Sequence, residues 1–229
     1  MTQRLVYFRS SVGRKMVLAL FGLGLLGYLI MHLSANLLIL GDNPQALDVY
    51  AHTLLSLGPL LIAIEIALAL VFLVHIYLAV VITLQNRSAR PDRYERVRDA
   101  GSPSKKNFSS KTMIYSGLVI LVFVVLHVLH FKYAIFGGKE YTVMVDGEPI
   151  RAFSTLVMTS FQNPWISLAY IVGLIWVFFH LRHGFWSAFQ TLGVHHPRLT
   201  PVIYSAGIVL AVVIAAGYVS IPVILYFGG

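Results

Sequence analysis

The chain has 229 residues, of which 58% are hydrophobic and only 11% charged, with a mean hydropathy of +0.78. Soluble domains are about 45–50% apolar and about 25% charged, so this composition indicates a membrane protein. The chain has no cysteine, which excludes protein-held iron–sulfur clusters, covalent c-type haem and disulfides. The net charge of +8 lies in loops between apolar runs, and this placement favours a membrane-topology signal over a nucleic-acid surface.

Five apolar runs are each long enough to cross a bilayer, because a spanning helix needs about 20 residues. They predict five transmembrane helices at about 16–40, 60–84, 113–136, 165–190 and 200–227. Since no soluble domain is expected between them, the predicted fold class is an all-α integral membrane protein, a bundle of five transmembrane helices with residues 1–229 as one domain.

The connections between these runs carry weaker signals. Residues 41–59 are expected to form a loop, and residues 141–147 predict a small β-hairpin that turns at Asp146-Gly147. Residues 153–162 are expected to form a short interfacial helix. In the first apolar run, Gly22, Gly24 and Gly27 are small enough to let a neighbouring helix or a flat cofactor approach the backbone.

Basic residues alternate between the two sides of the predicted membrane. The N-terminus, the loop 85–112 and the segment 182–198 together hold 14 of the 17 Lys and Arg, whereas residues 41–59 and 132–163 hold 0 and 3. The positive-inside rule therefore predicts a cytoplasmic N-terminus and an external C-terminus.

Four spans carry a histidine deep inside the apolar run, namely His32, His75, His127 and His180. An ionisable residue at that depth is costly and marks a candidate functional site. At about 1.5 Å per residue, His32 and His127 lie roughly 24 and 21 Å from the inner ends of their spans, and His75 and His180 roughly 13 and 15 Å from theirs. Two levels with two histidines each predict two stacked b-type haems with bis-imidazole ligation, which favours electron transfer.

Two alternatives stand beside this interpretation. A single histidine in a spanning helix often acts only as a polar contact between helices. His130 and His183 each lie three residues from a predicted ligand and compete for its role, although their position nearer the helix end is more typical of contact with a haem propionate or solvent.

Several stretches of the chain resemble one known family. They are Ser11–Lys15 (SVGRK), the His32-Leu33-x-x-Asn36 segment, Phe72–Ile76 (FLVHI), Asn86–Pro91 (NRSARP) and, as the longest, His180–Gly193 (HLRHGFWSAFQTLG). They are similar to the cytochrome b558 membrane-anchor subunit of succinate dehydrogenase (complex II), the single-chain, five-helix, di-haem type that is related to the fumarate reductase cytochrome b subunit. The resemblance covers nearly the whole chain.

The resemblance implies a function and a set of ligands. It assigns His32 and His127 to a distal haem iron and His75 and His180 to a proximal one, the same pairing that depth predicts. It implies an enzyme subunit of a prokaryotic cytoplasmic membrane, partnered with an iron–sulfur subunit and a flavoprotein subunit that oxidises succinate, with menaquinone or another quinone as acceptor. Some relatives carry a proton-conducting glutamate where this chain has Phe178.

If the protein binds haem and a quinone, further residues are candidates to contact them. Haem propionates need cations or hydroxyls as partners, and the candidates are Arg14, Lys15, Arg182 and His183. The alternative is that these long side chains only reach to the membrane interface and anchor the helix ends there. Quinone candidates are Glu65, His52 and Ser11, of which Glu65 can instead bind a hydroxyl or amide on a neighbour. The N-terminus and the basic loop 85–112 are expected to dock the iron–sulfur subunit.

Three other functions are compatible with parts of this pattern. The same scaffold serves as the anchor of a quinol:fumarate reductase. A b-type anchor of a formate dehydrogenase or hydrogenase is a second alternative, against which the motif at His180 argues. A cofactor-free transporter or structural anchor is the third, although neither broken helices nor inverted repeats are visible in the sequence.

Overall fold

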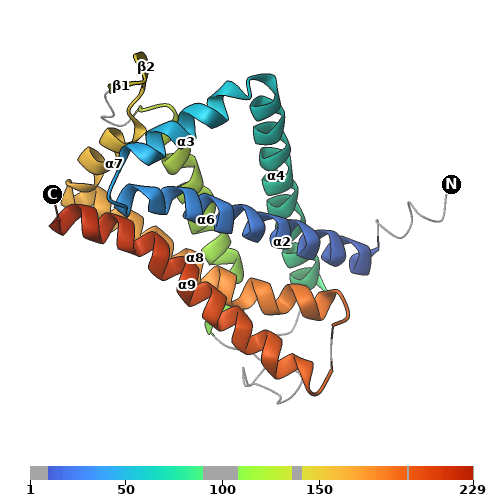
Figure 1. The fold of residues 1–229 in the computed structure, drawn as a ribbon. Coiled ribbons are helices and arrows are strands. Elements are labelled where there is room, and N and C mark those ends of the chain that lie inside the picture. The colour runs from blue at the N-terminus through green and yellow to red at the C-terminus, as the bar shows by residue number, and fades with distance from the viewer. Residues whose placement is uncertain (1–9, 90–107, 136–140, 195, 229) are drawn as a thin grey trace. The chain divides into compact units, whose positions relative to one another are not determined.

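A computed structural model of the protein describes residues 10–89, 108–135, 141–194 and 196–228. Within these ranges five helices are long and apolar enough to cross a membrane (Figure 1). They are α2 (Ser11–Asn36), extended by a 3₁₀-helix (Leu37–Leu40), α4 (Pro59–Ser88), α6 (Met113–His127), extended by a π-helix (Val128–Lys132), α8 (Pro164–Thr191) and α9 (Leu199–Phe227). The prediction of an all-α, multi-pass membrane protein is confirmed.

The ends of the first and third spans differ from the prediction. Helix α2 begins at Ser11 rather than near residue 16, because the Ser10 hydroxyl accepts a hydrogen bond from the Gly13 N–H at 3.0 Å and so caps the first turn. The third span ends at Lys132 rather than near residue 136, because the chain turns at Ala134, whose φ is +51°.

The described chain divides into two compact units, and each spanning helix contributes a segment to both. Unit 1 comprises Met1–Leu26, Leu68–Gly117 and Phe179–Ala211, and unit 2 comprises Gly27–Ala67, Leu118–Phe178 and Val212–Gly229. His75 and His180 belong to unit 1, and His32 and His127 belong to unit 2. Each histidine pair that depth predicts therefore lies within a single unit.

In unit 2 the connection after the first span is a helix, so the prediction of a loop at 41–59 is wrong. Helix α3 spans Gln45–Ser56 and buries Leu47 and Asp48. The Asn43 side-chain oxygen accepts the Gln45 N–H at 3.1 Å and so satisfies a donor of the first turn. The buried Leu47 provides the apolar contact that stabilises so short a helix.

The β-hairpin and the short helix after it are confirmed. Strand β1 (Thr142–Val145) pairs antiparallel with β2 (Glu148–Arg151), and Thr142 lies opposite Arg151. The two turn residues, Asp146 and Gly147, have φ values of +50° and +84°, which a two-residue hairpin with right-handed strand twist requires. Helix α7 follows at Phe153–Phe161.

A buried carboxylate joins α3 to α7. Asp48, which is 1% exposed, accepts hydrogen bonds from the Ser154 N–H at 2.6 Å and the Ser154 hydroxyl at 2.7 Å. The acceptor lies at the N-terminal end of α7, where backbone N–H groups lack helical partners and favour negative charge. Figure 1 shows α3 and α7 beside each other near the hairpin. The adjoining apolar core consists of Ile39, Leu47, Phe131, Leu156, Val157, Phe161 and Ile221.

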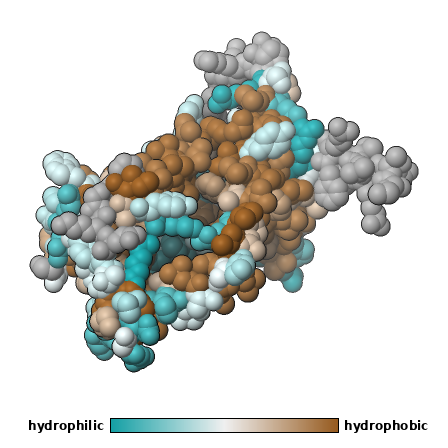
Figure 2. All heavy atoms as spheres, turned by 90° about the horizontal axis from the view of Figure 1, so that it is seen from above, coloured by the Kyte–Doolittle hydropathy of each residue, from teal (hydrophilic) through white to brown (hydrophobic). Residues whose placement is uncertain are grey.

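Apolar side chains cover much of the visible surface (Figure 2). On α4 large side chains such as Leu60, Ile62, Leu70 and Leu73 are more than half exposed. Exposed apolar surface on this scale is typical of helices that face lipid. Some predicted features lie outside the described residues: residues 1–9, most of the basic loop (90–107), His195 and the end of the predicted third span. The expected docking of an iron–sulfur subunit on the N-terminus and this loop therefore stays a prediction.

Candidate functional site

In unit 1 the two predicted proximal ligands face each other. His75 lies on α4 and His180 on α8, and their ring centroids are 6.5 Å apart with an angle of 65° between the ring planes. The α2 backbone lies beside one of these rings, because a Cβ at Gly22 would be 3.2 Å from His75 Cε1. The sequence predicted that small residues let a neighbouring group approach the backbone of this helix, and at Gly22 the group that does so is the His75 imidazole. Nothing lies within 4 Å of such a Cβ at Gly24 or Gly27.

In unit 2 the two predicted distal ligands also face each other. His32 on α2 and His127 at the end of α6 have ring centroids 5.8 Å apart and ring planes at 90°. Aromatic rings line both imidazoles. Tyr28 stacks on His32 with a centroid separation of 5.4 Å, and Phe123 stacks on His127 at 6.1 Å.

These separations match two imidazoles that share one metal ion. With each ligating nitrogen about 2 Å from the metal, ring centroids on opposite sides lie roughly 6–6.5 Å apart. The observed values of 5.8 and 6.5 Å bracket this range. Imidazole planes are free to rotate about the metal–nitrogen bond, so angles of 90° and 65° are both compatible with axial ligation.

Two ring nitrogens in these pairs have no partner in the described structure. The Nδ1 atoms of His75 and His127 are buried and make no hydrogen bond to any described residue. A buried polar atom without a partner is costly, so these two nitrogens mark both pairs as unusual positions in the apolar interior. Among the described residues, no cluster of three or more His, Cys, Asp or Glu is placed for metal binding.

His130, the competitor of His127, is engaged elsewhere. It is 5% exposed, and its Nδ1 lies 3.1 Å from the Tyr170 hydroxyl while its Nε2 lies 3.1 Å from the Ser160 hydroxyl. Both ring nitrogens therefore have protein partners, and the expectation of contact with solvent is wrong. His130 lies within the π-helix Val128–Lys132, where the spacing of side chains differs from that of a regular α-helix.

The four propionate candidates all belong to unit 1, together with His75 and His180. Arg182 donates to the buried Ser109 hydroxyl at 3.4 Å, and Arg14 and His183 are partly buried in their helices. Lys15 is exposed. These positions put positive charge in the same unit as the predicted proximal pair, and the propionate role stays a prediction.

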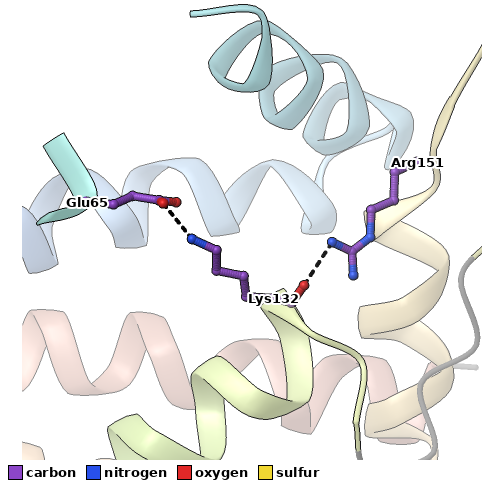
Figure 3. A network of polar contacts seen from close by, with 3 residues as sticks. All are labelled: Glu65, Lys132 and Arg151. Atoms are coloured by element: carbon purple, nitrogen blue, oxygen red, sulfur yellow. Dashed lines mark hydrogen bonds and ion pairs between the residues drawn. The ribbon is translucent and has the colours of Figure 1, made fainter. Parts of the chain in front are cut away.

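The quinone candidates are separated. Glu65 and His52 belong to unit 2, and Ser11 belongs to unit 1. His52 and Ser11 are exposed. Glu65 forms an ion pair with Lys132, a partner that sequence reasoning did not identify (Figure 3).

Arg151 extends this polar contact to the end of the third span. Its guanidinium donates to the Lys132 carbonyl at 3.1 Å (Figure 3). It also donates to the Phe131 carbonyl at 3.1 Å. Carbonyls at a helix end lack intrahelical partners, and a cation near them is favourable. The hairpin residue therefore closes the π-helix, which the sequence alone does not indicate.

Sequence reasoning also missed Ser116 and Tyr170. Ser116 on α6 lies 3.0 Å from His180 Nδ1, and Tyr170 on α8 reaches His130. The available signal was a polar residue inside an apolar run, which is costly unless it has a partner. Ser116, three residues after the span begins, carries that signal.

The part of the chain that the structure describes is an all-α membrane protein with five candidate spans and two pairs of neighbouring histidines. Comparisons with protein-family models, with curated proteins and with solved structures found no match to this chain. The resemblance to an anchor subunit therefore depends on the motif residues alone.

Proposed function

We propose that this protein is the di-haem cytochrome b membrane anchor of a succinate:quinone oxidoreductase, which carries electrons from an iron–sulfur subunit to a quinone such as menaquinone. The observation that supports it is the arrangement of four histidines from four spans as two facing pairs, 5.8 and 6.5 Å apart between ring centroids. The motif around His180 gives the proposal its particular family.

In this proposal His32 and His127 hold one haem b and His75 and His180 hold the other. A haem iron with both axial positions filled by imidazole supplies one-electron transfer and leaves no open position for oxygen. The protein's part is to fix the two imidazoles of each pair at a separation suited to a single metal, within an apolar and water-poor interior.

The surrounding residues have distinct tasks in the proposal. Gly22 leaves room for the His75 ring, and Tyr28 and Phe123 fix the ring planes in the other pair. Arg182 and His183 are placed to bind negatively charged haem substituents. Near the ion pair with Lys132, Glu65 is the candidate to exchange protons with a bound quinone.

The orientation in the membrane and the partners belong to the proposal as well. The basic N-terminus and loop 85–112 would face the cytoplasm and dock the iron–sulfur subunit, which a flavoprotein subunit joins. The C-terminus would then be external in a prokaryotic cytoplasmic membrane.

Haem content tests the proposal directly. Intact protein purified in detergent should contain two equivalents of protohaem, and alanine at any one of positions 32, 75, 127 and 180 should remove one. The matched control is His130→Gln, which changes a histidine one turn from His127 that contacts Tyr170 and Ser160 instead, and it should leave two haems. Purified wild-type protein without a Soret band would refute the proposal and favour a cofactor-free transporter or anchor.

A further inference from the structure

A buried serine contacts one of the four histidines within unit 1. Ser116 on α6 is fully buried, with 0% exposure, and its hydroxyl oxygen lies 3.0 Å from Nδ1 of His180 on α8. The same oxygen lies 3.0 Å from the Met113 carbonyl oxygen, three residues earlier in its own helix. Because no solvent reaches this hydroxyl, its two protein contacts decide where its proton lies.

The position of the hydroxyl proton fixes the tautomer of the histidine. A hydroxyl has one proton to donate and two lone pairs that accept. If the proton points to the Met113 carbonyl, the oxygen accepts Nδ1–H from His180, and both contacts are hydrogen bonds. If the proton points to His180, two oxygens face each other at 3.0 Å with no proton between them, which is repulsive. The first arrangement is therefore favoured.

We propose that Ser116 is a positioning residue that holds His180 as the Nδ1–H tautomer and so directs the Nε2 lone pair to the metal. The proposal depends on the proposed function, because it assigns His180 as a metal ligand. A metal-binding histidine whose other N–H is hydrogen-bonded has a fixed ring orientation and is a stronger donor. The Nδ1 atom of His75, the other member of the pair, has no side-chain hydroxyl as a partner among the described residues.

A stronger donor stabilises the oxidised metal relative to the reduced metal. Removing the Ser116 hydroxyl should therefore raise the reduction potential at the His75–His180 site and leave the His32–His127 site unchanged. Loss of a contact to a ligating histidine typically changes metal affinity by about 10–100-fold. If the site loses tenfold more affinity for the oxidised metal than for the reduced metal, the reduction potential of a one-electron couple rises by about 59 mV.

The experiment is a redox titration of the two haem components in the full-length protein, followed in the visible spectrum. Ser116→Ala removes the contact, and Ser116→Thr keeps a hydroxyl at the same position. Ser220→Ala is the matched control, because the Ser220 hydroxyl likewise donates to a carbonyl three residues back, that of Gly217, at 2.7 Å. We expect one midpoint potential to rise in Ser116→Ala, to return toward the wild-type value in Ser116→Thr, and to stay unchanged in Ser220→Ala.

The outcomes separate this proposal from the proposed function. Wild-type protein without haem overturns the proposed function, and this inference with it. Two haems whose potentials and ferric low-spin resonance signals are the same in Ser116→Ala and wild type overturn the positioning role alone. If Ser116→Ala loses one haem, retention of that haem in Ser116→Thr supports the role, and its loss in both variants counts against it.

Discussion

The contact between Gly22 and the His75 ring predicts opposite effects for two alanine substitutions in the same helix. A Cβ at Gly22 would lie 3.2 Å from His75 Cε1 and 3.6 Å from its Nδ1, whereas a Cβ at Gly24 would meet nothing within 4 Å. Both glycines are in the interior of α2, so the backbone contribution of the substitution is the same. The two variants therefore differ only in whether the added Cβ atom lies close to the His75 imidazole.

The expected magnitudes follow from these distances. Alanine in place of a glycine inside a helix stabilises by about 0.5–1 kcal/mol, so Gly24→Ala should raise the melting temperature by roughly 1–4 °C. At 3.2 Å the His75 ring must move by a few tenths of an ångström, and forced overpacking costs about 1–3 kcal/mol. Gly22→Ala should therefore be destabilised by about 0.5–2 kcal/mol overall, and Gly22→Val by more.

Thermal denaturation of the purified variants in one detergent measures this difference, with haem content as a second measurement. Under the proposed function, Gly22→Val should lose the haem of the His75–His180 pair before that of the other pair. If Gly22→Ala raises the melting temperature as much as Gly24→Ala does, the imidazole does not lie against the α2 backbone and the reasoning is refuted.

Two further predictions concern the polar contacts of unit 2, and thermal denaturation checks both. Asp48→Ala should lower the free energy of unfolding by about 3–5 kcal/mol, because it leaves two buried donors of Ser154 without an acceptor, and Asp48→Asn, which keeps an acceptor, should cost clearly less. Arg151→Gln should lower the free energy of unfolding by about 1–2 kcal/mol because it leaves the Phe131 and Lys132 carbonyls without their cation. Lys132→Gln should lower it by at most about 1 kcal/mol, because the two side chains of its ion pair with Glu65 are 45% and 42% exposed. Equal losses in the last two variants would contradict the assignment of Arg151 as the residue that closes the π-helix.

The spans could be predicted from sequence because their signal is local. Twenty or more consecutive apolar residues leave no alternative to a helix in lipid, since the backbone must satisfy its own hydrogen bonds. The hairpin was predictable for a similar reason, because Asp146-Gly147 is suited to the positive φ values of its turn. Helix α3 was missed because it is short and depends on tertiary contacts, chiefly those of Leu47 and Asp48.

The histidine pairing was predictable from depth alone, because helical rise converts sequence position into height above one face of the membrane. The partners of the histidines were not predictable. The Ser116 contact depends on which faces of α6 and α8 meet, and the three-residue separation of His127 and His130 does not reveal that a π-helix intervenes. For Glu65 the sequence left open a hydroxyl or amide partner and a role at a quinone; its observed partner is Lys132, and the quinone role stays a prediction.

The imidazole rings of the two histidine pairs have different neighbours, and this difference would affect their strength as metal donors. In unit 1 a hydroxyl fixes the ring of His180 through a directional hydrogen bond, and the glycine backbone at position 22 limits the movement of His75. In unit 2 Tyr28 and Phe123 stack on the rings, the Asn36 amide nitrogen lies 3.4 Å from His32 Nδ1, and His127 Nδ1 has no hydrogen-bond partner among the described residues. Metals bound at the two sites would therefore have unequal donors, because ring basicity depends on the hydrogen bond at the outer nitrogen and not on stacking. Under the proposed function, such unequal donors would give the two haems different reduction potentials, and residues of this chain would set the difference.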